Sequence, residues 1–121
     1  MRDGILQRPS LSLLLLAACL IVPAGSSWAD ALPTYHLTLE DHTFLPSHLE
    51  VPANSRFLIE VTNKDATTGE FESTEMKFEK VVVGQGHVTA HAGPLEPGTY
   101  KFFDDYHPEA TGTVTAVAPK E

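Results

Sequence analysis

The sequence predicts an all-β domain, either a β-sandwich or a small Greek-key barrel. Short runs of the chain alternate apolar and polar residues, which is typical of strands with one buried face. Clusters of turn residues separate these runs, and helical periodicity is scarce, with a single candidate helical turn at residues 73–77. About seven short strands at this spacing favour an all-β architecture.

The first predicted strand begins at Tyr35, where Tyr35, Leu37 and Leu39 alternate with polar residues. The strands expected after it cover residues 57–62, 80–83, 87–91 and 100–103, and a last run opens at 114. Turn signals stand between the runs, at residues 52–54, 63–65, 84–86 and 96–98. We therefore expect one domain over residues 30–117, followed by a loose tail at residues 118–121.

The N-terminus carries an export signal. Two arginines precede an apolar run at residues 11–22, and small residues follow the run up to Ala29. The run has 12 residues, whereas a helix that crosses a bilayer needs about 20. This order predicts a secretory signal peptide at residues 1–29, with cleavage after Ala29. Residues 16–19, Leu-Ala-Ala-Cys, offer an alternative, a bacterial lipobox that would lipidate Cys19; either route exports the protein.

The predicted domain is acidic and lacks cysteine. The chain has 121 residues, with 8 Lys and Arg against 16 Asp and Glu, and a net charge of −8. Because residues 1–29 hold Arg2, Arg8 and Asp3, the remaining 92 residues carry 6 basic and 15 acidic side chains. This balance argues against DNA or RNA as a partner, since phosphate binding needs clustered Lys and Arg. The single cysteine, Cys19, lies in the predicted signal peptide, which excludes thiol nucleophiles, disulfides and cysteine-based metal sites from the domain.

Three segments of the domain resemble the cupredoxin family. Residues 44–63 contain F-L-P, L-E-V-P-A-N and L-I-E-V-T-N, similar to the family's opening F-x-P, L-x-V-P-A-G and V-x-N. Residues 96–102, E-P-G-T-Y-K-F, resemble its x-P-G-T-Y-x-F strand, and residues 112–115, G-T-V-T, resemble its closing strand. The resemblance covers about residues 34–117 and implies a Greek-key β-sandwich of about seven or eight strands with a metal site at one end.

The residues at the family's copper positions differ from the blue-copper pattern. In the register of the x-P-G-T-Y-x-F strand, Asp104 occupies the cysteine position and His107 keeps the second histidine. Ala110 stands at the usual methionine position, and residues 69–72, Gly-Glu-Phe-Glu, lie near that of the first histidine. A blue-copper site requires a Cys thiolate, so the sequence excludes it, together with plastocyanin-type electron transfer at such a site.

A narrower group fits more of the sequence: the small periplasmic cupredoxins of bacterial iron-uptake systems, which are similar to the cupredoxin domain of EfeO. The segments that carry this resemblance are F-E-S at 71–73, E-K-V-V at 79–82, G-P-L-E-P-G-T-Y at 93–100 and F-F-D-D-Y-H-P at 102–108. It implies a periplasmic protein that binds or oxidises ferrous iron, with copper as an alternative. The implied partner is a high-affinity inner-membrane iron permease or another periplasmic iron-uptake component.

The candidate metal ligands are carboxylates and one histidine. Alternation along residues 100–104 turns Asp104 inward, where a carboxylate is costly unless it is paired or metal-bound. His107 follows on a loop that can fold back over the same end, and Glu70 and Glu72 share one side of an extended segment. The complete predicted ligand set is Asp104, His107, Glu72, Glu70, Asp105 and Glu79. Such ligands suit Fe(II), Fe(III) or Mn, and they also accept Cu(II).

Each candidate also has an interpretation without metal. In this alternative, the glutamates form a solvated acidic face, the two aspartates are hydrogen-bonded turn residues, and His107 is a structural loop histidine. Five other histidines form a second candidate set, namely His36, His42, His48, His87 and His91. Since His87 and His91 are four residues apart on a predicted strand, they would point outward together, and scattered surface histidines are the simplest account of this set.

The sequence therefore predicts an exported domain that handles iron for an inner-membrane uptake system, with the metal between residues 70–72 and the 104–107 loop. Carboxylates stabilise ferric over ferrous iron by charge, which leaves ferroxidase activity open, although we expect binding rather than catalysis and assign no catalytic residue. One alternative is a non-blue copper-binding carrier or electron-transfer partner that uses the same end. The other is a metal-free interaction module whose acidic end docks on a basic patch.

Overall fold

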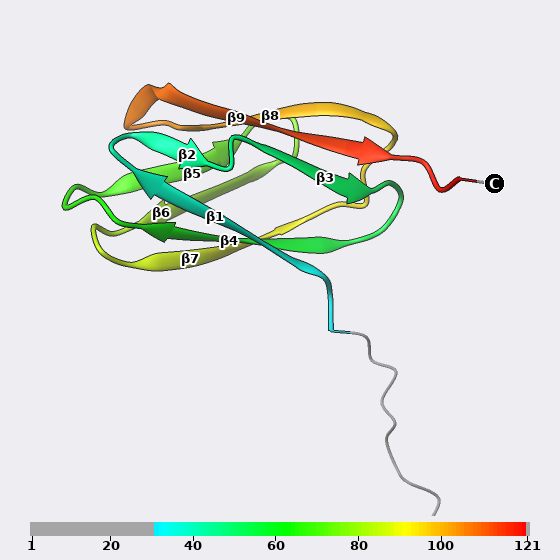
Figure 1. The fold of residues 1–121 in the computed structure, drawn as a ribbon, viewed down its shortest axis with the longest axis horizontal. Coiled ribbons are helices and arrows are strands. Elements are labelled where there is room, and N and C mark those ends of the chain that lie inside the picture. The colour runs from blue at the N-terminus through cyan, green and yellow to red at the C-terminus, as the bar shows by residue number, and fades with distance from the viewer. Residues whose placement is uncertain (1–30, 121) are drawn as a thin grey trace, which may run out of the picture. The chain divides into compact units, whose positions relative to one another are not determined.

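The domain is a two-sheet β-sandwich in a computed structural model that describes residues 31–120 (Figure 1). This part of the chain forms nine strands and no helix, which confirms the predicted fold class. The predicted signal peptide and the alternative lipidation at Cys19 lie outside the described residues. Within residues 31–120 there is no helix that is long and apolar enough to cross a membrane.

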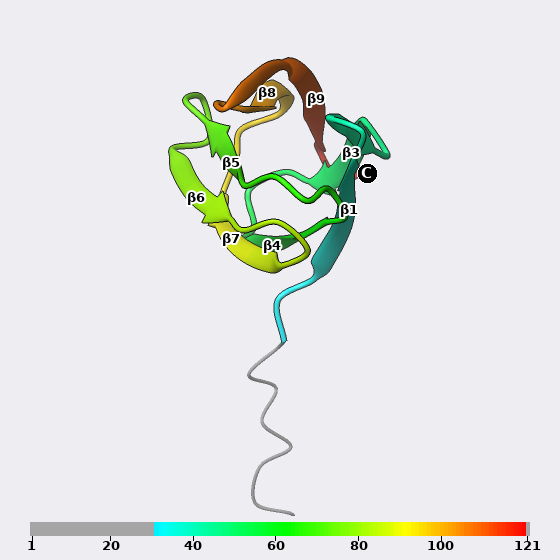
Figure 2. The ribbon, with the colours of Figure 1, turned by 90° about the vertical axis from the view of Figure 1, so that its left-hand side faces the viewer.

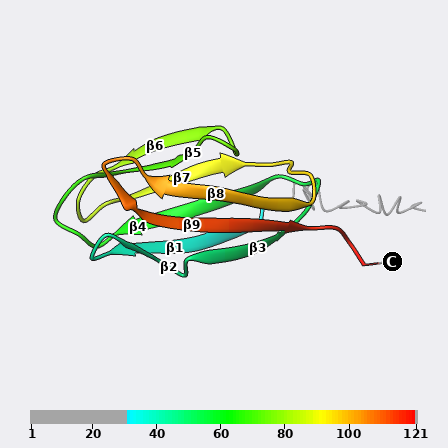
Figure 3. The same ribbon diagram turned by 90° about the horizontal axis from the view of Figure 1, so that it is seen from above.

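The nine strands are divided between the two sheets, and the chain crosses repeatedly from one sheet to the other. Their bounds are β1 (Thr34–Glu40), β2 (Thr43–Leu45), β3 (His48–Pro52), β4 (Phe57–Asn63), β5 (Gly69–Ser73), β6 (Phe78–Val82), β7 (His87–Ala92), β8 (Gly98–Asp104) and β9 (His107–Val117). One sheet has the order β2-β1-β4-β7 and the other the order β3-β9-β8-β5-β6. The pairs β1–β4 and β3–β9 are parallel, and the other pairs are antiparallel. Most connections therefore cross from one sheet to the other, as Figure 3 shows from above.

The core lies between the two sheets, which face each other in the end view of Figure 2. On β4, Phe57, Ile59 and Val61 are buried, whereas the residues between them are partly or fully exposed. This alternation follows from the two-residue period of a strand, which sends every second side chain to the same face. Each such buried side chain contributes about 1.5–3 kcal/mol to folding, and the inner faces of both sheets supply them.

Three phenylalanines connect the sheets near one end of the sandwich. Phe44 on β2, Phe71 on β5 and Phe102 on β8 are each at most 1% exposed. Their ring centroids lie 5.0–5.8 Å apart, in tilted or edge-to-face contacts that aromatic pairs prefer. Because Phe102 is two residues before Asp104 on the same strand, its burial also turns Asp104 toward the interior.

The structure differs from the sequence-based expectation in two details. Of its nine strands, six correspond to the predicted alternating runs, and β2, β3 and β5 are strands that the alternation did not predict. The candidate helical turn at residues 73–77 is a tight turn between β5 and β6. There, the hydroxyl of Ser73 accepts a hydrogen bond from the Met76 N–H at 2.9 Å, and Lys77 has a φ of 64°. A helix cannot continue through that left-handed residue.

Candidate metal centre

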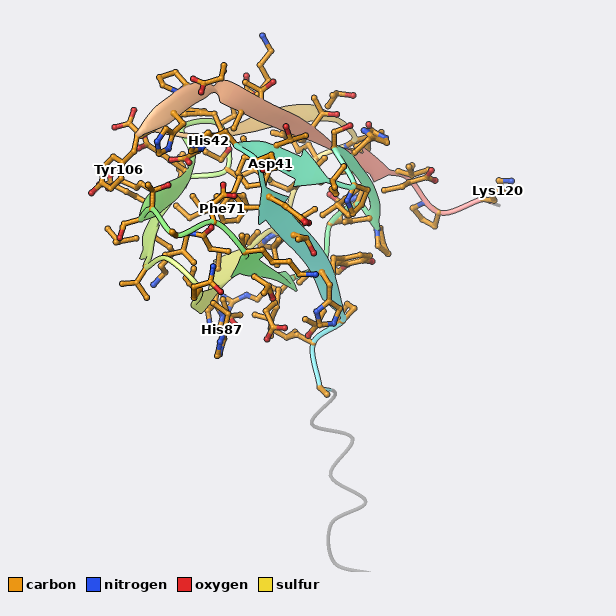
Figure 4. All side chains as sticks on the ribbon, turned by 60° about the vertical axis from the view of Figure 1, so that its left-hand side comes forward. Asp41, His42, Phe71, His87, Tyr106 and Lys120 are labelled. Carbon is orange, nitrogen blue, oxygen red and sulfur yellow. The ribbon has the colours of Figure 1, made fainter. Side chains whose placement is uncertain are left out.

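The predicted ligands come together where β8 turns into β9. β8 ends at Asp104, β9 begins at His107, and Asp105 and Tyr106 form the turn between them. β1 and β4 end, and β5 begins, at this same end of the sandwich, which lies at the left in Figure 1. Figure 4 shows Tyr106 and His42 in the upper part of the molecule and His87, at the start of β7, below them.

Asp104 is buried and well supplied with hydrogen-bond donors. Its side chain is 1% exposed, which confirms the inward direction expected from strand alternation. Oδ1 accepts hydrogen bonds from the Glu70 N–H at 2.9 Å and from the Tyr106 N–H at 3.0 Å. Oδ2 lies 3.0 Å from Nδ1 of His107. The burial of this carboxylate is therefore offset by three contacts, one of them the turn contact expected of an aspartate at this position.

His107 folds back over Asp104 and stacks on a second histidine. Nδ1 is the ring nitrogen of His107 that contacts Asp104, and Nε2 is the other ring nitrogen. The His107 ring lies on the ring of His42, with centroids 4.0 Å apart and an angle of 26° between the planes. The side chains of His107 and His42 are 26% and 41% exposed, so solvent reaches both rings.

Asp65 holds His42 in place. His42 and Asp41 form the turn between β1 and β2, with φ angles of 55° and 52° in the left-handed region. The carboxylate of Asp65 accepts the Asp41 N–H at 2.7 Å and the His42 N–H at 3.0 Å, and it lies 3.6 Å from Nδ1 of His42. The hydrogen bond from the His42 N–H is the main cause that holds the pKa of Asp65 below its ordinary value, although burial opposes it. Asp65 was not among the predicted site residues.

A second cluster lies on the outward face of β5 and β6. Carboxylate oxygens of Glu70, Glu72 and Glu79 lie within 4.8 Å of one another, and Glu72 pairs with Glu79 across the two strands. Glu70 is only 8% exposed. Burial is the largest cause that raises the pKa of Glu70, followed by the hydrogen bond with Glu72 and the negative charges of Glu79 and Asp105. This crowding of like charges is the kind of environment that a bound cation would relieve.

The β8–β9 turn borders this cluster. The negative charge of Glu70 is the largest cause that raises the pKa of the Tyr106 phenol, followed by desolvation of the phenol. Tyr106 is 50% exposed, and the backbone N–H of Asp105 donates to the Glu70 carbonyl at 2.9 Å. A phenol and a further carboxylate therefore stand beside the three glutamates. Sequence reasoning included Asp105 in the ligand set and missed Tyr106, because a tyrosine in a turn has no distinguishing local pattern.

The predicted ligands thus form two groups, on opposite sides of β5. Phe71 pairs with Asp104, and both side chains point inward. Glu70 is the neighbour of Phe71 along the strand, so its side chain points to the other face. We call Asp104 and His107, with His42 and Asp65, the inner group, and Glu70, Glu72 and Glu79 the outer group. The sequence predicted one site between residues 70–72 and the 104–107 loop, whereas the structure places these candidate ligands on opposite faces of β5. Metal binding by either group stays a prediction.

Comparison with known proteins establishes the family. The family described as the cupredoxin-like domain matches residues 12–116. The chain belongs to this family. An uncharacterized protein of Rickettsia prowazekii (strain Madrid E) is 36% identical to this cupredoxin over 78 residues, which cover 64% of the chain and 62% of that protein. The chain therefore matches less than two thirds of the length of that relative.

Solved cupredoxin structures share the fold at low identity. The metal-binding domain of the Cu(I)-exporting P-type ATPase CopA of Streptococcus pneumoniae D39 has a TM-score of 0.64 and 14% identity, covering 73% of this chain and 88% of that one. Amicyanin from Paracoccus versutus has a TM-score of 0.56 and 14% identity, with coverages of 74% and 87%. A purple cupredoxin from Nitrosopumilus maritimus has a TM-score of 0.50 and 20% identity, with coverages of 69% and 99%. The narrower resemblance to iron-uptake cupredoxins stays a prediction.

The structure describes all the residues that the resemblance placed at or near blue-copper ligand positions. A Cβ at Gly69, in the segment near the first histidine position, would lie 2.8 Å from Oδ2 of Asp104. Gly69 therefore leaves room for the Asp104 carboxylate, and a side chain there would displace it. Ala110, which the resemblance placed at the methionine position, is 2% exposed, and its side chain has no atom that could bind a metal. Asp104 and His107, which the resemblance placed at the cysteine and second-histidine positions, form a carboxylate–imidazole pair with a 3.0 Å contact between Oδ2 and Nδ1.

The remaining histidines lie outside both groups. His87 and His91 are exposed on β7, which confirms their predicted outward direction. His36 and His48 are also exposed; Nδ1 of His36 lies 3.1 Å from Glu60, and Nδ1 of His48 lies 2.7 Å from Thr113. The interpretation as scattered surface histidines therefore holds for these four and not for His42, which packs against His107.

Proposed function

We propose that this cupredoxin is an exported, periplasmic protein that binds iron for a high-affinity inner-membrane iron-uptake system. The observation that carries the proposal is the outer group, in which three carboxylates have oxygens within 4.8 Å of one another. Glu70 is nearly buried there, and its pKa is raised by burial and by its acidic neighbours. A cation would stabilise all three carboxylates at once, and the predicted signal peptide supports a periplasmic location.

Iron is the metal that the donor chemistry and the resemblance to iron-uptake cupredoxins favour together. Carboxylate oxygens are hard ligands, which suit Fe(II), Fe(III) and Mn(II) better than Cu(I). Their charge stabilises ferric iron more than ferrous iron, so oxidation of the bound metal is compatible with this site. The phenol of Tyr106 beside Glu70 adds a further oxygen donor.

The surroundings of the outer group support docking on a membrane component. Val81, which pairs with Glu70 across β5 and β6, is 52% exposed, and Tyr106 is 50% exposed. Exposed apolar side chains next to a binding site are typical of interaction surfaces. An iron permease, or another periplasmic component that receives the metal, is the partner we propose for this face.

Copper is the second candidate cargo. The metal-binding domain with TM-score 0.64 was solved with Cu(I), and amicyanin mutants that share the fold were solved in Cu(I) forms. His107 supplies an imidazole in the inner group, where a non-blue Cu(II) site would use nitrogen and oxygen ligands. This function would use the inner group rather than the outer one.

Anaerobic isothermal titration with Fe(II) tests the proposal, using protein expressed with its own N-terminal segment. Glu72→Gln removes one charge of the outer group with little change in shape, and we expect it to weaken Fe(II) binding by about tenfold or more. The matched control is Glu50→Gln, which changes an exposed glutamate on β3 outside both groups and should leave the affinity within about twofold. Unchanged Fe(II) affinity in Glu72→Gln would overturn the assignment. Because most sites bind Cu(II) more tightly than Fe(II), copper binding without any Fe(II) binding is the result that would favour the second candidate.

A further inference from the structure

We propose that Tyr106 is a further ligand of the outer group, and that its phenolate makes this site retain iron in the ferric state. The inference rests on the proposed iron site and adds the oxidation state of the cargo. A phenolate oxygen is a hard ligand, and it is more basic than a carboxylate, because tyrosine releases its proton at a much higher pH than glutamate. It therefore stabilises Fe(III) more than Fe(II), since the ion of higher charge gains more from a strong anionic donor.

The β8–β9 turn holds Tyr106 beside Glu70. Oδ1 of Asp104 accepts the backbone N–H groups of both residues, that of Glu70 at 2.9 Å and that of Tyr106 at 3.0 Å. The N–H of Asp105 also donates to the Glu70 carbonyl at 2.9 Å. The turn that carries the phenol is therefore attached to β5 at the most buried glutamate of the outer group. Such attachment reduces the ordering cost of bringing the phenol to an ion.

The phenol lies in the electrostatic field of the outer group. The negative charge of Glu70 is the largest cause that raises the pKa of Tyr106, ahead of desolvation, and the charges of Asp105 and Glu79 add to it. In the metal-free protein these carboxylates therefore keep the phenol protonated. A trivalent cation among the same carboxylates has the opposite effect on the phenol. When the phenol oxygen binds the ion, its proton passes to solvent, which reaches the side chain because Tyr106 is 50% exposed.

The burial of Glu70 is a separate reason to expect an ion at this point. Glu70 is 8% exposed, and within residues 31–120 no N–H group or cationic side chain donates to its carboxylate. Asp104, which is also buried, has three such contacts. A buried carboxylate without a cationic partner is costly, and an ion bound beside it removes that cost. The ion would then lie next to the residue that the β8–β9 turn places beside Tyr106.

Titration of the full-length chain with Fe(III), supplied as its nitrilotriacetate complex at neutral pH, tests whether Tyr106 is a ligand. A phenolate bound to Fe(III) gives a visible charge-transfer band, and resonance Raman excitation in this band enhances the ring vibrations of the bound tyrosine. We expect both signals in the wild type and neither in Tyr106→Phe, which keeps the ring and the backbone contact with Asp104. Fe(III) affinity should fall by about tenfold or more in Tyr106→Phe, whereas Fe(II) affinity, measured without oxygen, should fall by less.

The other two tyrosines provide the control. Tyr35 and Tyr100 lie near the starts of β1 and β8, at the opposite end of the sandwich from the β8–β9 turn, so Tyr35→Phe should keep both signals. For the same reason, the spectrum of the unaltered protein decides the proposal even if Tyr106→Phe fails to fold.

The outcomes separate this proposal from the proposed function. Wild-type protein that binds Fe(II) and Fe(III) without the charge-transfer band would overturn the role of Tyr106 and leave the iron site in place. Tyr106→Phe that keeps the band and the Fe(III) affinity would do the same. Wild-type protein that binds neither ion would overturn both proposals.

Discussion

Replacing Asp104 by alanine tests whether one buried carboxylate holds the inner group together. Three donors contact it: the N–H groups of Glu70 and Tyr106 at Oδ1, and Nδ1 of His107 at Oδ2. The Glu70 N–H lies in a buried position, so leaving it without an acceptor costs about 1–3 kcal/mol, and each of the other two contacts contributes about 1 kcal/mol. Because removing the charge also relieves its desolvation, we expect Asp104→Ala to lower the free energy of unfolding by about 2–4 kcal/mol.

Urea unfolding followed by circular dichroism measures this loss, and thermal melting provides a second readout. In a domain of this size, about 1 kcal/mol corresponds to roughly 4–8 °C, so the melting temperature should fall by about 10 °C or more. Asp105→Ala is the matched control, because this neighbouring carboxylate is exposed and the change should stay within about 0.5 kcal/mol. Asp104→Asn keeps an acceptor oxygen for the backbone N–H groups and should show a smaller loss than alanine. Equal stability of Asp104→Ala and the wild type would refute the claim that these hydrogen bonds stabilise the turn.

Two further predictions concern colour and pH. Copper-loaded protein should lack the intense blue absorption that a Cu–thiolate bond gives, because the only cysteine lies in the predicted signal peptide; a strong blue band from the processed protein would contradict the ligand argument. Glu70→Gln should raise the melting temperature of the metal-free protein at neutral pH, because burial and nearby carboxylates raise the pKa of Glu70. A carboxyl whose folded-state pKa is raised favours folding below its unfolded pKa and loses that contribution as the pH rises through the folded value, so the gain should vanish in acid. The same difference in melting temperature at acidic and neutral pH would count against this cause.

Much of the fold could be predicted because its strands follow the two-residue period. The runs around Leu37, Ile59 and Phe102 each place alternate side chains in the core, and the structure confirms all three. β2 was harder to predict, since its three residues are too few to show a period. β2 contributes Phe44 to the core, where this side chain packs against Phe71 of β5 and Phe102 of β8, both distant in sequence.

The sequence predicted the candidate ligands better than their grouping. The inward direction of Asp104 and its contact with His107 both follow from local order, three residues apart on one turn. The stack of His42 on His107 joins residues 65 positions apart, and it depends on a left-handed turn that Asp65 holds from the end of β4. No local pattern encodes such a contact, because it arises only when β1 and β4 of one sheet and β8 of the other end at the same end of the sandwich.

The two groups at this end of the sandwich differ in how strongly a bound cation would stabilise their carboxylates. The charge of Asp104 is compensated by three hydrogen-bond donors, so the carboxylate is stable without metal and is suited to orienting His107. Glu70 is nearly as buried, yet carboxylates and a phenol surround it, and these neighbours raise rather than lower its pKa. A cation bound at the outer group would therefore gain more electrostatic stabilisation than one at the inner group, where hydrogen bonds already compensate the carboxylate. This difference is why we propose iron for the outer group and copper, the second candidate, for the inner group.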